Sequence, residues 1–167
     1  MTISASEPNY AWWLKEELKT DSKLIEGIPL SEFDVRLESV GLPSVSDLPT
    51  YDTLGHEEIK RGDFVFRMSG NFNDMKKTQI VLVGAYKEHD GNKGRFLTVI
   101  DPKQKPGKRV LLFEKWPGLS GFSFLEIKDM EITWWPCLYC GGGVAVRFKN
   151  GKFFVDYEAE EGSDEEF

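Results

Sequence analysis

The sequence lacks most of the features that mark enzymes and membrane proteins. It contains only 2 cysteines and 2 histidines. Two cysteines are too few for a disulfide framework. The same low counts leave few thiol nucleophiles and few imidazole acid–base groups for catalysis. It has no apolar run of the roughly 18 residues that a membrane-spanning helix needs. A nucleophile elbow, a P-loop and a dinucleotide-binding glycine fingerprint are also missing. We therefore expect a chain without catalytic activity and without a cofactor.

The N-terminal residues have neither the basic start nor the apolar stretch of a secretory signal, so we expect a cytoplasmic protein. Apolar residues make up 40% of the chain and charged residues 29%, which is typical of a globular protein. A chain of 167 residues is long enough to bury its own core. We predict one globular domain over residues 1–157 and an acidic tail over residues 158–167.

Charge is sorted along the chain into three blocks. Residues 1–59 carry 4 Lys and Arg against 12 Asp and Glu, a net charge of −8. Residues 60–115 carry 13 against 6, a net charge of +7, and residues 116–167 carry 4 against 10, a net charge of −6. An acidic segment can occupy a basic groove in place of a polyanion. The basic middle block is therefore the first place to look for a polyanion site.

The N-terminal part has helix-like spacing. Ala11, Leu14, Leu18 and Ile25 fall near one face of a helix, which predicts a helix over residues 9–26. A second short helix is predicted from Ser31 on, so that residues 9–41 form a helical N-terminal part.

From residue 60 the pattern changes to short strands bounded by turn residues. The predicted strands cover residues 62–68, 79–87, 95–101, 108–115, 122–127, 131–135, 144–149 and 152–157. Asn150-Gly151 predicts a two-residue hairpin turn between the last two strands. Residues 80–83 are apolar on both faces, which predicts a central strand. We expect an α+β protein in which one or two N-terminal helices precede a mainly antiparallel small β-barrel, OB-like or related, over residues 60–157.

Aromatic residues alternate with cations through the basic block, as a surface for single-stranded nucleic acid requires. Cations bind the phosphates and aromatic rings stack on the bases. Arg109, Phe113 and Lys115 share one face of a strand by alternation. The predicted nucleic-acid-binding residues are Arg61, Arg67, Phe72, Lys76, Lys77, Tyr86, Lys87, Arg95, Arg109, Phe113 and Lys115. The alternative is that the strand aromatics belong to the core and the lysines only keep strand edges soluble.

The tail ends in Asp164, Glu165, Glu166 and Phe167. This acidic, Phe-terminated ending resembles the tails of bacterial and some phage single-stranded-DNA-binding proteins. The resemblance covers about ten residues and does not extend to the globular part. It implies that the tail competes with DNA for the basic groove, and that these four residues dock a protein partner, with Phe167 as the apolar anchor. The alternative is an ordinary solvated chain end.

Cys137 and Cys140 form a C-x-x-C pair before three glycines. The pair matches half of a zinc site, and His56 and His89, the two histidines of the sequence, are the candidates to complete the ligand set. No second C-x-x-C is present, so we assign no metal and interpret the cysteines as small apolar residues beside a glycine turn.

Taken together, the sequence predicts a non-catalytic protein that binds single-stranded nucleic acid and contacts a protein through its tail, without a membrane. The alternative is a small acidic inhibitor or immunity protein that blocks a toxin or host factor. In that case residues 1–59 form the working surface, because an acidic face suits a basic target.

Overall fold

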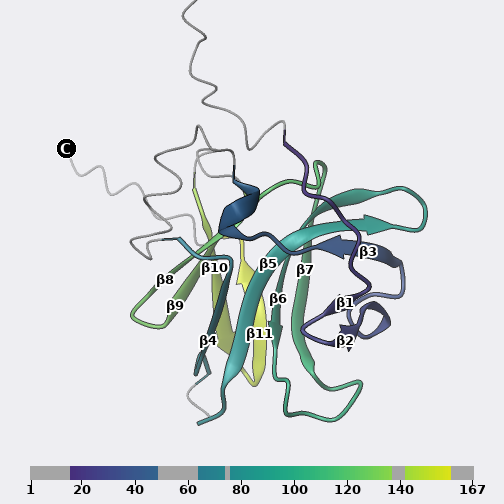
Figure 1. Ribbon diagram of the computed structural model, residues 1–167. Helices are drawn as coiled ribbons and strands as arrows, with labels where there is room; N and C mark the ends of the chain where they lie inside the picture. Colours follow the sequence, from purple (N-terminus) through teal and green to yellow (C-terminus); the bar gives the residue numbers. More distant parts are fainter. Residues whose placement is uncertain (1–15, 49–63, 74–75, 137–141, 159–167) are drawn as a thin grey trace, which may run out of the picture.

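The computed structural model describes residues 16–48, 64–73, 76–136 and 142–158. These residues are almost entirely β-structure. They form eleven strands, and their helical content is limited to two three-residue 3-10 helices, η2 (Leu30–Glu32) and η3 (Val45–Asp47). The strands belong to three separate open sheets (Figure 1).

The large sheet has five strands, and three of them pair directly with its long central strand β5. The strands are β3 (Leu37–Gly41), β4 (Arg67–Gly70), β5 (Gln79–Glu88), β6 (Lys93–Ile100) and β7 (Val110–Pro117). β6 and then β7 lie on one side of β5, while β3 and β4 pair with different parts of its other side. β5 and β6 are buried on both faces over most of their length. The predicted central strand at residues 80–83 is therefore confirmed.

The small sheet has the order β11-β10-β9-β8. Its strands are β8 (Phe124–Lys128), β9 (Glu131–Trp135), β10 (Val144–Lys149) and β11 (Lys152–Asp156). Asn150 and Gly151 join β10 to β11 with φ angles of 53° and 77°, the left-handed pair that a type I′ hairpin turn needs. The predicted Asn-Gly hairpin is confirmed.

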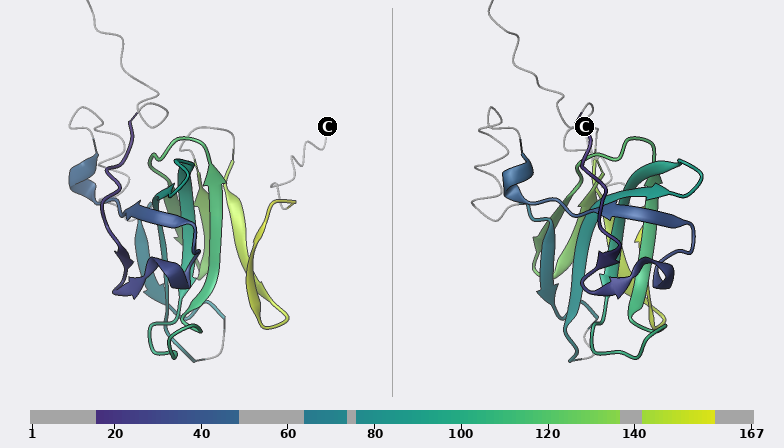
Figure 2. Two further views of the ribbon diagram at one scale, coloured as in Figure 1. Left: turned by 90° about the vertical axis from the view of Figure 1, so that its right-hand side faces the viewer. Right: turned by 45° about the vertical axis from the view of Figure 1, so that its right-hand side comes forward.

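The two sheets pack face to face as a sandwich (Figure 2). Alternate residues of β5 and β6, such as Val83 and Leu97, contact Leu125, Trp134 and other residues of the small sheet in one buried core. These alternating positions are what a two-layer packing requires, because successive side chains of a strand point to opposite faces. A single backbone bridge between residues 65 and 125 links the chain just before β4 to β8.

A second core covers the outer face of the large sheet. The short hairpin of β1 (Leu24–Ile25) and β2 (Ile28–Pro29), together with η2, lies over this face (Figure 2). Ile25 and Ile28, which are at most 1% exposed, pack there with Phe96 and other residues of the large sheet. The N-terminal segment therefore forms a third layer over part of the sandwich.

The two predicted N-terminal helices are wrong for the residues that the structure describes. Residues 16–26 contain no helix, because Glu26 and Gly27 turn the chain with φ angles of 50° and 75° and pair β1 with β2. The second predicted helix is replaced by η2 and by β3, which pairs with β5. The capping box forms instead at Ser44 and Asp47, around η3.

The predicted closed barrel is also wrong, and with it the α+β class. Within the part of the chain that the structure describes, β7 pairs only with β6, and β11 pairs only with β10. Hydrogen bonding is therefore not continued from one sheet to the other across the side where β7 and β11 lie near each other. The fold is an open sandwich rather than an OB-like barrel.

Candidate nucleic-acid interface

The antiparallel order of the strands brings three turns to the same end of the sandwich (Figure 1). β4, β6 and β10 run toward this end, and β5, β7 and β11 run away from it. The turn between β8 and β9 lies at the side of the sandwich, away from the other three (Figure 1). The turns that follow β4, β6 and β10, with the strand residues next to them, carry most of the lysines of the middle and C-terminal blocks. We call this the basic end and define it by Lys76, Lys77, Lys103, Lys105, Lys108, Lys149 and Lys152.

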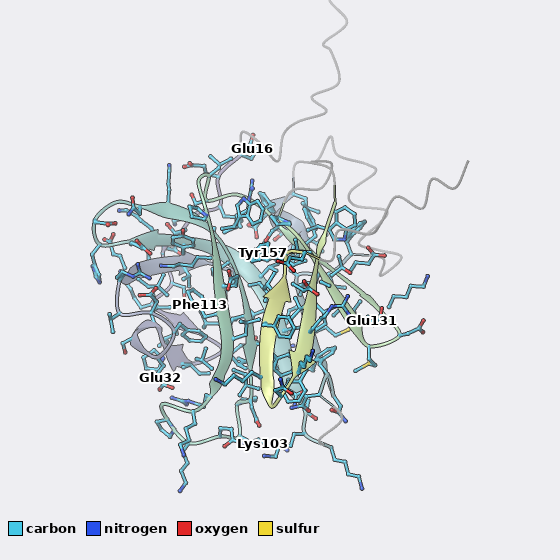
Figure 3. All side chains as sticks on the ribbon, turned by 180° about the vertical axis from the view of Figure 1, so that it is seen from behind. Glu16, Glu32, Lys103, Phe113, Glu131 and Tyr157 are labelled. Carbon is cyan, nitrogen blue, oxygen red and sulfur yellow. The ribbon has the colours of Figure 1, made fainter. Side chains whose placement is uncertain are left out.

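The lysines of the basic end are all exposed. None of them forms an ion pair with a carboxylate within the described ranges, in contrast to most cations on the strands. Lys103 projects at this end of the molecule in Figure 3. Seven exposed ammonium groups on neighbouring turns produce a positive potential that attracts polyanions. The basic end is therefore a positively charged part of the described surface.

Buried polar side chains hold the turns of the basic end in place. Asp101, 4% exposed, accepts a hydrogen bond from the backbone N–H of Lys103 at 3.1 Å. Gln79 is fully buried, and its Oε1 accepts a hydrogen bond from the backbone N–H of Phe72 at 2.8 Å. The Gln79 Nε2 donates to Asn73 Oδ1 at 3.0 Å. These bonds hold the backbone near Lys76 and at Lys103 without using any lysine side chain.

Three predicted site residues lie together, Arg109 just before β7 and Phe113 and Lys115 within it, but the N-terminal segment covers them. Glu32 receives hydrogen bonds from the Arg109 guanidinium and from the backbone N–H of Gly107 at 3.0 Å. The Phe113 ring packs against Phe33, with centroids 5.7 Å apart. Lys115 donates a hydrogen bond to Asp34 at 2.8 Å. An acid–aromatic–acid segment of this chain, residues 32–34, thus covers the two cations and the aromatic ring that the sequence assigned to the site. Glu32 and Phe113 are labelled in Figure 3.

The electrostatics of this contact match its geometry. Hydrogen bonds from Arg109 and Gly107 lower the pKa of Glu32 below its ordinary value. The pKa of Asp34 is also lowered, mainly by hydrogen bonds from Arg36, against the effect of burial. Burial alone lowers the pKa of the Lys115 ammonium, but hydrogen bonds to its two carboxylate partners outweigh this and raise it. The shifted pKa values keep Glu32, Asp34 and Lys115 charged at neutral pH.

Most other predicted cations of the strands also have carboxylate partners from residues 1–59. Arg67 pairs with Glu26, and Lys87 pairs with Glu38 at 3.2 Å. Arg95 is only 6% exposed on β6, where burial lowers its pKa. The acidic first block thus neutralises much of the basic middle block inside the molecule.

The remaining predicted site residues separate into two groups. Tyr86 is 2% exposed and belongs to the second core. Phe72, Lys76 and Lys77 lie in the turn between β4 and β5, with Phe72 half-buried against the sandwich core. Arg61 lies outside the described residues. Lys76 and Lys77 are thus the two predicted residues that belong to the basic end.

Sequence reasoning missed the grouping of the other five lysines of the basic end. The signal that identifies them is the succession of hairpins. When consecutive antiparallel strands are joined by short turns, alternate turns lie at the same end of the sheet. The lysines of residues 101–109 and 149–152 therefore belong together, although about 40 residues of sequence separate them.

The predicted partner and metal residues lie outside the described part of the chain. Asp164, Glu165, Glu166 and Phe167 follow the last described residue, and Cys137 and Cys140 fall in the gap between β9 and β10. β11 runs away from the basic end, so residue 158 leaves the sandwich at the opposite end. Within the described ranges, no group of three or more His, Cys, Asp and Glu residues is placed to hold a metal ion.

Among the described residues, no helix has both the length and the apolar character needed to cross a membrane. Comparison of the chain with protein-family models, with curated proteins and with solved structures finds no match in any of the three.

Proposed function

We propose that this protein is a non-catalytic nucleic-acid-binding protein that contacts the phosphate backbone through its basic end. The observation that carries the proposal is the gathering of seven exposed lysines, without described carboxylate partners, on three turns at one end of the sandwich. Lysines on turns are long and mobile, and they bind phosphates as point charges without reading base identity. We therefore expect sequence-independent binding.

Base stacking contributes less to this proposal than the sequence suggested. Phe113 and Tyr86 pack against neighbours of the second core, and rings buried in a core are not platforms for bases. Phe72 lies in a turn of the basic end and is half-buried, so it is the described ring best placed to contact an unstacked base. Single-stranded nucleic acid stays our proposed ligand, with most of the affinity supplied by phosphates.

The experiment is a titration of a fluorescent single-stranded oligonucleotide, followed by anisotropy at several salt concentrations. The test variant replaces Lys103, Lys105 and Lys108 with Gln. Because each phosphate contact on a single strand contributes roughly 0.7 to the slope of log affinity against log salt, we expect the slope to fall by about 2. Its matched control replaces Lys19, Lys23 and Lys87 with Gln, removes the same charge away from the basic end, and should change the slope little.

Two outcomes would contradict the proposal. One is the absence of oligonucleotide binding at low salt. The other is an equal loss of affinity in both triple variants, which would point to overall charge rather than to the basic end.

The inhibitor alternative draws less support from the contacts of the acidic block. Glu17, Glu26 and Glu32 each pair with a cation of the same chain, as do Asp34 and Glu38. Carboxylates that are already paired inside the molecule contribute less to attracting a basic target. A pull-down that recovers one stoichiometric protein, together with no oligonucleotide binding, would favour the inhibitor.

A further inference from the structure

A pocket of about 560 Å³ lies beside the turn between β5 and β6. This turn is at the opposite end of the sandwich from the basic end, because β5 runs away from the basic end and β6 returns toward it. Arg36, Tyr86, Glu88, Lys93 and Lys115 line the pocket. They come from four parts of the chain: the segment before β3, the end of β5, the start of β6 and the end of β7.

The hydroxyl of Tyr86 is the unusual group in this pocket. Tyr86 is 2% exposed, and its hydroxyl has no hydrogen-bond partner among the described residues, although the Lys115 ammonium lies 5.6 Å from the ring centroid. Gly94 makes room for this hydroxyl, because a Cβ at that position would lie 2.9 Å from it. The ring is buried while the hydroxyl oxygen itself still reaches solvent in the pocket, so the hydroxyl can donate a hydrogen bond to a ligand there without giving up a bond inside the protein.

Three cations surround the pocket, and each can donate a further hydrogen bond to a ligand. Lys115 donates to Asp34 and Glu88 and has a third ammonium hydrogen. Arg36 uses its Nε and Nη2 on Asp34, which leaves Nη1 available. Lys93 pairs with Glu17 at 2.6 Å, yet its side chain is 46% exposed. These donors match the lone pairs of an oxyanion.

The pocket also contains a carboxylate, Glu88, which would repel an oxyanion that carries no proton. Glu88 is 4% exposed, and its Oε1 accepts from Lys115. Its second oxygen has no hydrogen-bond partner among the described residues. A carboxylate in this position rejects a fully deprotonated anion and accepts a hydrogen bond from a ligand O–H. The ligand must therefore combine an oxyanion with a hydroxyl donor.

We propose that this pocket binds a small phosphate, either hydrogen phosphate or a phosphate monoester that carries a hydroxyl. The phosphate oxygens accept from Lys115, Arg36 and the Tyr86 hydroxyl. The ligand's O–H donates to Glu88. This site is separate from the basic end and does not depend on nucleic-acid binding.

The test is calorimetric titration of the full chain with inorganic phosphate at pH 7, with sulfate as the comparison. Sulfate has the same shape and no proton at this pH, so it should bind at least about tenfold more weakly, the equivalent of one lost hydrogen bond to a charged group. Glu88→Gln should abolish this discrimination, because an amide can donate a hydrogen bond to sulfate.

Tyr86→Phe tests the hydroxyl while keeping the ring and its packing. We expect about a tenfold loss of phosphate affinity with little change in Tm. Tyr157→Phe is the matched control, because the Tyr157 hydroxyl donates to Glu114 outside the pocket, and it should leave phosphate affinity unchanged. The triple Gln variant at Lys103, Lys105 and Lys108 should also bind phosphate normally.

Three results would overturn the proposal that this pocket binds phosphate. One is no phosphate binding below about 10 mM, weaker than the millimolar affinities of a weak specific complex. Another is equal affinity for phosphate and sulfate in the unmodified chain. The third is loss of phosphate binding in the triple lysine variant but not in Tyr86→Phe, which would assign the anion to the basic end.

Discussion

The ring of Phe33 meets the ring of Phe113 edge to face, at an interplanar angle of 65°. On its other side Phe113 packs against Phe96, with centroids 5.2 Å apart. Phe113, which the sequence analysis predicted to stack on bases, therefore packs between the N-terminal segment and the large sheet. This contact determines what a substitution at Phe113 does.

Phe113→Ala should lower the free energy of unfolding by about 3 kcal/mol, because it removes a ring that contacts two others and leaves a cavity. Urea denaturation measures the loss. Phe154→Ala serves as the control, since Phe154 is 37% exposed on β11, and it should cost less than about 1 kcal/mol. Similar losses in the two variants would contradict the proposed role of Phe113 in packing.

Asp34→Asn should destabilise the protein by about 2 kcal/mol at neutral pH, because it weakens hydrogen bonds to Arg36 and Lys115. The pKa of Asp34 is lowered in the folded chain from its ordinary value of 3.8. Its stabilisation is therefore complete above about pH 4 and is lost as the pH falls further. Urea denaturation at pH 7 and pH 2.5 should show a smaller difference between the two proteins at pH 2.5.

Asp21→Asn is the control for this pH dependence. Asp21 pairs with Lys19 at 3.1 Å, and its side chain is 64% exposed, so the pair contributes little to stability. A stability difference for Asp34→Asn that stayed constant from pH 7 to pH 2.5 would argue against the ion pairs as its source.

Gln79→Leu should cost about 2 kcal/mol, because it leaves the backbone N–H of Phe72 without its acceptor. The same bonds hold the turn that carries Lys76 and Lys77, so amide hydrogen exchange of residues 71–73 should become faster. Gln104→Leu is the control: Gln104 donates to Asp101 at 3.3 Å near the surface, and its loss should have a smaller effect. Unchanged exchange at residues 71–73 would show that Gln79 does not hold the turn.

Gly94→Ala should destabilise the protein by about 2–3 kcal/mol, because the new Cβ would lie 2.2 Å from the Trp116 carbonyl oxygen across the β6–β7 ladder. Gly27→Ala is the comparison. Gly27 has open space around it and a φ of 75°, so this change costs only the left-handed conformation, about 1 kcal/mol. Thermal unfolding separates the two effects, and a milder loss at Gly94 than at Gly27 would contradict the steric argument.

The β-rich half of the chain was largely predictable because its signals are local. Strands β9 and β10 have the predicted bounds, and β5 extends one residue beyond its prediction. Val and Ile runs between turn residues specify a strand whatever it pairs with. The Asn150-Gly151 turn is equally local, because few other residue pairs adopt two consecutive left-handed conformations.

The N-terminal half was not predictable in the same way. Its apolar residues are spaced about as a helix requires, but Ile25 and Ile28 are buried by contact with the distant residues Phe96 and Ile100. Tertiary packing decides such segments, and spacing alone cannot identify the partner. The accessibility of the site could not be predicted for the same reason. The sequence around β7 does not reveal that an acidic segment, distant in sequence, covers its cations.

Barrel closure was likewise a question of tertiary arrangement. Eight short strands are compatible with a barrel and with a sandwich. The outcome depends on whether the edge strands β7 and β11 pair with each other, and their sequences contain no feature that specifies this. The grouping of the lysines, in contrast, follows from the order of hairpins and was available from the sequence.

Because the strands alternate in direction, the lysine-bearing turns concentrate positive charge at one pole of the described molecule, and residue 158 lies at the opposite pole. In the proposed binding mode, a charged polymer meets this pole end-on rather than along a sheet face. A molecule bound end-on covers only a short stretch of polymer and leaves its sheet faces open to neighbouring copies. Residue 158 then lies on the side away from the polymer.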